Sequence, residues 1–326
     1  MKQVVKWLYS LPLIVGILAL YCGGSEINLM AVMNEIGAYI AGGEISSDTM
    51  IVLDIRLPRI VLALLVGASL SGSGALMQAV FKNPLVDPFL LGISSGAILG
   101  CALSIGLFPS IPTQILAFAG ALLCAFAVLF IAHIAGGGKI ALVLSGVVLS
   151  AFLSAMTGLI KYFVDPYKVQ TIVLWLLGSL SLSSWNGVAI VFAGLLIGFS
   201  PIYFLSWRIN ILSLDDVEAQ TLGMSPHKMR AVMIILVSFS CALAVSLSGI
   251  IGWVGLLTPH IARFIVGPQM QKLIPASLCL GGVLLLIADT IARSATPYDL
   301  PVGVVTAILG APFFILLLKR AKSNWS

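Results

Sequence analysis

The chain has 326 residues, of which 60% are hydrophobic and only 9% are charged. This composition is too apolar for a soluble fold and is typical of a polytopic helical membrane protein. The formal net charge of +5 does not indicate nucleic acid as a partner, because Lys and Arg gather at the cytoplasmic ends of membrane helices. We therefore expect an all-α protein, a single transmembrane domain over residues 1–326 that contacts membrane lipid and no nucleic acid.

The first apolar run covers residues 7–22 and follows two lysines, so it predicts a first helix with a cytoplasmic N-terminus. Residues 23–55 contain several acidic side chains and neither Lys nor Arg, so we expect this segment on the outer, non-cytoplasmic side of the membrane. Pro58 suits the start of a helix, and a long apolar run follows it. We expect the second span to begin there.

The remaining apolar runs predict further spans, and at roughly 20 residues each the chain has room for about ten. After the first, the expected helices lie near residues 60–81, 89–107, 113–132, 140–160, 187–205, 231–247, 253–266, 273–292 and 302–318. Residues 171–185 are apolar at first but then broken by Gly178 and several serines. We expect a partial helix at the outer surface for that segment.

Alternating these spans places most Lys and Arg residues and both termini on the cytoplasmic side, as the positive-inside rule requires. Three arginines at the outer mouths of long spans are exceptions, namely Arg56, Arg59 and Arg293. Arg is well suited to bidentate capture of a carboxylate. A basic side chain at a helix end can also extend to the membrane interface, and from these residues alone both interpretations stay open.

The most polar segment of the chain, residues 208–230, lies between two apolar runs and must form an exposed loop. Its apolar side chains at helical spacing are Leu214, Val217 and Leu222. Acidic residues occupy what would be a first turn, and Gly223 and Pro226 end the pattern. We expect a short amphipathic helix that is offered to a partner protein, then a break and a second short helical turn.

The chain holds few residues that could perform chemistry. Apart from Asp289 the expected spans are almost free of ionisable side chains, whereas ion-coupled carriers need buried carboxylates or histidines. Residues 136–139 resemble a phosphate loop, but Ile140 stands where Ser or Thr is required. All five cysteines lie in apolar runs at no metal-ligand spacing. We therefore expect no catalytic, cofactor or metal site in this chain, and an energy source outside it.

Several motifs, in order and over nearly the whole chain, resemble the permease family of ATP-binding-cassette importers for ferric siderophores, haem and cobalamin. They are RLPR at 56–59, the run 67–80 followed by NPL at 83–85, GISSGA at 92–97, GWVGL at 252–256 with PH at 259–260, and LPVG at 300–303 with GAP at 310–312. The resemblance implies a type II importer permease of ten helices in the inner membrane. It also implies a homodimer, two cytoplasmic ATPase subunits that hold ATP and Mg, and a soluble or lipid-anchored substrate-binding protein.

The resemblance also implies roles for individual residues. Coupling helices at about residues 212–228 dock the ATPase through Leu214, Asp215, Asp216, Glu218, Ala219, Leu222 and Gly223, although the family often has Gly where this chain has Asp215. Acidic residues of the binding protein meet Arg56, Arg59 and Arg293. We expect these arginines at a wet rim, with no part of the core dependent on them. The cytoplasmic gate is formed by Asn83, Leu85, Gly138 and Lys139.

The substrate is not identified by these residues, because the expected pathway offers no evident ligand for iron. A ferric siderophore, haem, cobalamin and an oxyanion such as molybdate all stay open. Two other classes of protein are weighed against the importer: an ion-coupled secondary transporter, and a receptor or anchoring protein that moves no substrate.

Overall fold

The computed structural model describes residues 2–22, 31–32, 35, 46–212, 214–296 and 298–322, with the backbone alone for 2–6 and 316–322. Within these residues the chain is helical and contains no strand. The elements are α1 (Lys2–Tyr21), α3 (Ser47–Met50), η1 (Ile51–Arg56), α4 (Leu57–Phe81), η2 (Pro88–Leu91), α5 (Ile93–Gly106), α6 (Thr113–Ile134), α7 (Lys139–Phe163), α8 (Pro166–Leu176), α9 (Trp185–Phe204), α10 (Ser206–Leu212), α11 (Asp216–Thr221), α12 (Pro226–Ser248), α13 (Val254–Val266), α14 (Met270–Ser294) and α15 (Val302–Lys322).

The predicted helices are confirmed in position. Among the described residues, six helices are long and apolar enough to cross a membrane: Ser47–Phe81, Thr113–Ile134, Lys139–Phe163, Trp185–Phe204, Pro226–Ser248 and Met270–Ser294. Four shorter apolar helices occupy the other expected positions, at Trp7–Tyr21, Ile93–Gly106, Val254–Val266 and Val302–Ile315. The number of membrane crossings, expected to be about ten, stays a prediction.

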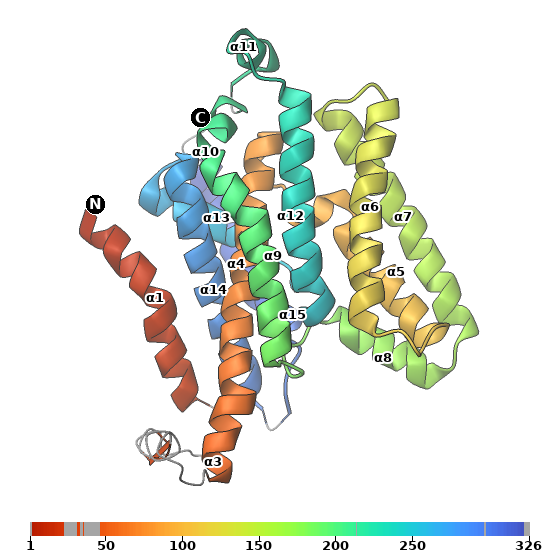
Figure 1. Ribbon diagram of the computed structural model, residues 1–326, viewed down its shortest axis with the longest axis vertical. Helices are drawn as coiled ribbons and strands as arrows, with labels where there is room; N and C mark the ends of the chain where they lie inside the picture. The colour runs from red at the N-terminus through yellow and green to blue at the C-terminus, as the bar shows by residue number, and fades with distance from the viewer. Residues whose placement is uncertain are drawn as a thin grey trace.

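Helix α4 forms the centre of the bundle, in contact with α9, α12, α13 and α14 (Figure 1). It is lined with glycine and serine, which let neighbouring backbones approach closely. A Cβ atom on Gly74 would lie 1.7 Å from the Gly255 carbonyl oxygen of α13. One on Gly67 would lie 2.3 Å from the Gly281 carbonyl oxygen of α14. Helices α5 to α8 pack beside this centre, and α6 joins them to it through α12 (Figure 1).

The expected start of the second span at Pro58 is wrong. The helix begins at Ser47 and continues through the wider π-helical turn η1 into α4. Ser46 caps it, with its Oγ accepting from the Thr49 N–H at 3.4 Å. In the wide turn the Leu57 N–H bonds the Val52 carbonyl oxygen, which gives a proline room inside a continuing helix. Most of the acidic segment before Ser46 lies outside the described residues.

The expected partial helix at 171–185 is displaced toward the N-terminus. Helix α8 begins after Asp165, whose carboxylate accepts from the Lys168 N–H at 3.0 Å, and Pro166 stands in its first turn. It ends before Gly178, which has φ of +72°. A capping carboxylate followed by proline is a strong local helix start, so the apolar run is helical only in its first half.

Candidate partner-docking and gate sites

The helix α11 stands beyond the start of α12, at one end of the molecule, while α3 lies at the opposite end (Figure 1). Asp215 begins α11 through a capping box, in which the Glu218 carboxylate accepts from the Asp215 N–H at 3.3 Å. Gly223, with φ of +76°, ends the turn that follows α11. The predicted short helix is thereby confirmed. The second helical turn expected after it is instead the first turn of α12, because Pro226 starts a long helix.

The apolar side chains predicted on this segment are exposed. Leu214 is 41% exposed, Val217 72% and Leu222 60%. Ala219 is 1% exposed and anchors the helix to the bundle. A segment with this many charges cannot lie in hydrocarbon, so its exposed leucines form an apolar surface in water. Such a surface is typical of a protein interaction site.

Two basic side chains attach α11 to the bundle. The buried Arg230 of α12 forms an ion pair with Asp216 of α11. The hydrogen bond from Arg230 holds the pKa of Asp216 below its usual value. Lys82, directly after α4, donates to the Leu214 carbonyl oxygen and lies 3.4 Å from an Asp215 carboxylate oxygen. The helix is therefore joined to both α12 and the turn that follows α4.

That turn contains two of the predicted gate residues. The Asn83 side-chain oxygen accepts from the Leu85 N–H at 2.9 Å, which leaves the Leu85 side chain 54% exposed. His260 of α13 lies 2.9 Å from the Pro84 carbonyl oxygen and holds the turn from the other side. The turn therefore presents an apolar side chain and is linked through Lys82 to α11.

The other two predicted gate residues start α7. Gly138 has φ of +93° and Lys139 is the first residue of the helix. The Lys139 side chain lies near Lys82 and Arg230. The structure thus brings both predicted gate segments to the end of the molecule that carries α11. Their gating role stays a prediction.

The three arginines predicted to meet the binding protein lie at the opposite end, near α3, with Arg56 and Arg59 buried and Arg293 partly buried. All three donor nitrogens of Arg59 are used: Nε and Nη2 meet Asp289 at 3.0 and 2.9 Å, and Nη1 meets Asp299 at 2.7 Å. Arg56 donates to the Leu20 carbonyl oxygen at 2.7 Å. Arg293 donates to the Ala19 carbonyl oxygen and lies 3.9 Å from Asp289.

The expectation that no part of the core depends on these arginines is wrong. Asp289 is fully buried, so it must stay paired with Arg59. Asp299 is 41% exposed at its side chain, and it also accepts from the Ser181 hydroxyl at 2.7 Å. Sequence reasoning missed Asp299 as a partner of Arg59, because the two residues are 240 positions apart. Contact of these arginines with a binding protein stays a prediction.

No group of three His, Cys, Asp or Glu side chains in the described parts of the chain is placed to hold a metal ion.

Comparison with known proteins gives a consistent result. Residues 11–320 match the model of the FecCD transport family. The chain is 53% identical to a Helicobacter pylori protein named "probable iron chelatin transport system permease protein", over 95% of this chain and 96% of that protein. It is 36% identical to a molybdate import system permease protein of Haemophilus influenzae, over 97% of this chain and 96% of that protein. It is also similar to a solved structure described as "an inward-facing conformation of a putative metal-chelate type ABC transporter", with a TM-score of 0.87, 33% identity and coverage of 98% of this chain and 100% of that one.

Proposed function

The chain belongs to the FecCD transport family, and we infer that it is the membrane-spanning permease subunit of an ATP-binding-cassette importer for a metal chelate. The observation that carries this conclusion is the match over residues 11–320, which includes every long apolar helix described above. Permease subunits of this family are not themselves enzymes, so the energy for transport comes from a partner.

The substrate that the comparisons favour is an iron chelate. The relative named for iron chelatin is 53% identical, whereas the relative named for molybdate is 36% identical. Molybdate is therefore less favoured than an iron chelate. An ion-coupled secondary transporter needs ionisable side chains that are free to bind the coupling ion, whereas the buried Asp289 of the candidate span α14 is already paired with Arg59.

The assembly contains two copies of this chain, two cytoplasmic ATPase subunits that hold ATP and Mg, and a binding protein on the other side of the inner membrane. The α11 end and both termini face the cytoplasm. The ATPase docks on α11 through the exposed Leu214 and Leu222, with Asp215, Asp216, Glu218, Ala219 and Gly223 shaping the helix and its end. Support comes from the exposure of an apolar edge on a well-capped helix.

Docking on α11 acts directly on the cytoplasmic gate in this proposal. A displacement of α11 moves Lys82, because Lys82 bonds the Leu214 carbonyl oxygen. Lys82 directly precedes Asn83 and starts the turn that contains Leu85. It also lies near Lys139, the residue after Gly138. A short chain of contacts therefore links the ATPase surface to all four gate residues.

The binding protein approaches the opposite end through carboxylates directed at Arg56, Arg59 and Arg293. Asp299 already binds the Nη1 atom of Arg59 and is the exposed member of that cluster. An incoming carboxylate then competes with Asp299 for Arg59 and leaves the buried pair with Asp289 intact. Asp299 acts in this proposal as an internal substitute for the partner's acidic residue.

The deciding experiment is uptake into proteoliposomes that contain this chain and its ATPase, with the binding protein added outside. We expect ATP-dependent uptake of a radiolabelled ferric chelate, and little uptake of labelled molybdate or cobalamin. Uptake of molybdate instead would replace the substrate assignment and keep the importer. Uptake that survives without ATP and follows an imposed ion gradient would overturn the importer itself.

A further inference from the structure

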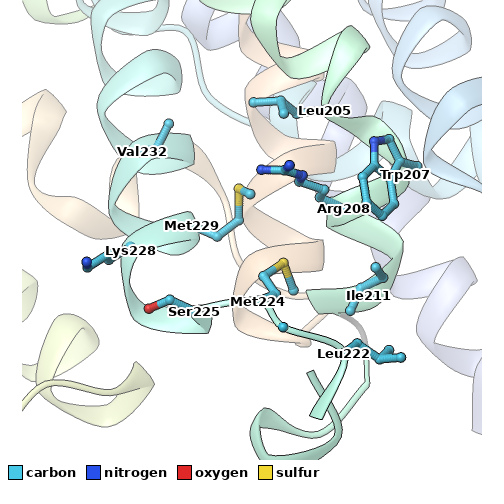
Figure 2. Close-up of a pocket in the computed structure, with 11 residues that line it drawn as sticks. Leu205, Trp207, Arg208, Ile211, Leu222, Met224, Ser225, Lys228, Met229 and Val232 are labelled. Carbon is cyan, nitrogen blue, oxygen red and sulfur yellow. The ribbon is translucent and has the colours of Figure 1, made fainter. Parts of the chain in front are cut away.

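A cleft of about 390 Å³ opens between the end of α9, α10 and the beginning of α12 (Figure 2). Its apolar lining comes from Leu205, Ile211, Leu222, Met224, Met229 and Val232. This volume lies within the range of small-molecule sites, roughly 300–1,000 Å³. The cleft lies immediately behind the docking helix α11, since Leu222 and Gly223 form part of its wall.

The cleft carries positive charge without a negative partner. Arg208 extends its guanidinium group into the cleft, whereas Lys228 contributes to the rim with its ammonium group directed away from Arg208 (Figure 2). The guanidinium carbon of Arg208 lies 5.3 Å from the centre of the Trp207 ring, which fixes its position. No Asp or Glu lines the cleft, and in the described parts of the chain neither basic residue forms an ion pair. A ligand of complementary charge is an anion.

The position of the cleft indicates where that anion comes from. It lies where the candidate span α9 ends and the candidate span α12 begins. Tyr203, Phe204 and Trp207 are exposed here, at 51%, 77% and 52%. Exposed Trp and Tyr at the end of a span are typical of the boundary between lipid headgroups and hydrocarbon. A site at such a boundary would have headgroups within reach on one side and acyl chains on the other.

We propose that this cleft binds an anionic phospholipid of the leaflet on the α11 side. The phosphate pairs with Arg208, whose planar fork matches phosphate oxygens, and Lys228 adds a second charge at the edge. The acyl chains lie along Leu205 and Val232. A bound lipid fills the space behind Leu222 and supports α11 from the membrane side. This effect on docking rests on the proposed function above, whereas lipid binding does not.

The test is lipid exchange into the purified protein followed by native mass spectrometry, with phosphatidylglycerol compared with phosphatidylcholine. The wild type should retain phosphatidylglycerol preferentially. The variant Arg208→Gln with Lys228→Gln should lose that preference by roughly tenfold or more, because each basic residue near a membrane surface attracts anionic lipid. The control is Lys161→Gln with Lys272→Gln, which removes the same charge outside the cleft and should keep the preference. An unchanged unfolding temperature confirms that both variants are folded.

Three outcomes of the lipid measurement would overturn the proposal. The first is an unchanged preference in the cleft variant, and the second is an equal loss in the control, which would indicate a diffuse surface charge. The third is displacement of the lipid by millimolar inorganic phosphate, which would indicate a site for the free anion. ATPase association is then measured in nanodiscs of pure phosphatidylcholine. These nanodiscs contain no anionic lipid, so the wild type and the cleft variant should associate equally weakly. If the cleft variant loses association and the wild type keeps it, Arg208 and Lys228 contact the ATPase and not a lipid.

Discussion

Each end of the molecule holds a buried arginine paired with aspartate, and the two pairs differ in how fully the arginine is bonded. Arg59 uses every donor nitrogen on Asp289 and Asp299. Arg230 donates to Asp216 through Nη2, while its Nε and Nη1 are buried without a hydrogen-bond partner in the described parts of the chain. Buried polar groups are normally satisfied. Arg59 is thus fully bonded within the chain, whereas Arg230 has two buried donor nitrogens left for another molecule or another conformation.

The partners of the two arginines differ in the same way. Asp289 lies within the long helix α14 and has no exposed surface, so Arg59 joins α4 to α14 in the core. Asp216 lies in the six-residue helix α11, which Arg230 holds through this ion pair and Lys82 holds through the Leu214 carbonyl oxygen. We interpret the Arg59 cluster as a fixed anchor and the Arg230 pair as a joint that moves when α11 is pulled.

The largest effect should come from breaking the anchor. Asp289→Ala leaves Arg59 buried beside one half-exposed carboxylate, and removal of one partner of a buried pair costs about 3–5 kcal/mol. We expect a marked loss of folded protein, measured as yield and unfolding temperature in detergent. Asp299→Ala removes the half-exposed partner of the same arginine, leaves the buried pair with Asp289 in place, and is the matched control that should cost far less. Equal effects of the two changes would contradict the anchoring role of Asp289.

A large effect without unfolding should come from the docking surface beside the joint. Leu214→Glu with Leu222→Glu should abolish association with the ATPase, because burial of each leucine is worth about 1.5–3 kcal/mol. Co-purification with the tagged ATPase measures the loss. Leu182→Glu places one such charge on an exposed leucine outside α11 and should leave association unchanged. Retained association in the double variant would remove α11 as the docking helix.

A smaller effect should come from loosening the joint itself. Asp216→Asn removes the negative charge and weakens the bond to Arg230. ATP hydrolysis should continue, while the amount of substrate taken up per ATP falls several-fold, which corresponds to a loss of about 1 kcal/mol in coupling free energy. The measurement is the ratio of uptake to hydrolysis in proteoliposomes. An unchanged ratio would show that the Arg230 pair does not transmit movement.

The pH dependence of this joint follows from the pKa of Asp216, which lies below its usual value of 3.8. A lowered folded-state pKa means that the contribution of this group is fully present above the unfolded value and is lost only as the pH falls through the lowered one. The coupling ratio should therefore not change through Asp216 between about pH 8 and pH 5. A titration of coupling within that range would have to come from another group.

The smallest effect should come from the exposed member of the anchor. Burial alone would raise the pKa of Asp299, but hydrogen bonds from Arg59 and Ser181 bring it below its usual value, so the group is ionised and competes with an incoming carboxylate. Asp299→Asn should then tighten binding of the substrate-binding protein by a few-fold, about 0.5–1 kcal/mol. Surface plasmon resonance on nanodiscs measures the affinity. Weaker binding would mean that Asp299 helps the partner and does not replace it.

Several features of the α11 region could be predicted because their causes are local. Asp215, Glu218 and Gly223 lie within nine residues and set the start and end of the helix by capping and by a left-handed turn. The extended backbone of Asp215, with φ of −66° and ψ of 154°, needs no glycine. The π-helical turn before Pro58 could not be predicted, because proline signals a helix start more often than an interruption.

The amino-acid sequence by itself determined where the apolar helices lie, which segment must be in water, and that the chain lacks a phosphate loop of its own. These features depend on runs of neighbouring residues, and hydrocarbon excludes unpaired polar backbone whatever the tertiary arrangement. Only the tertiary structure decided that Arg59 meets Asp289 and Asp299, that Lys82 holds α11, and that Arg208 points into a cleft. Pairing between residues that are distant along the chain depends on how the helices pack, and no local pattern specifies that.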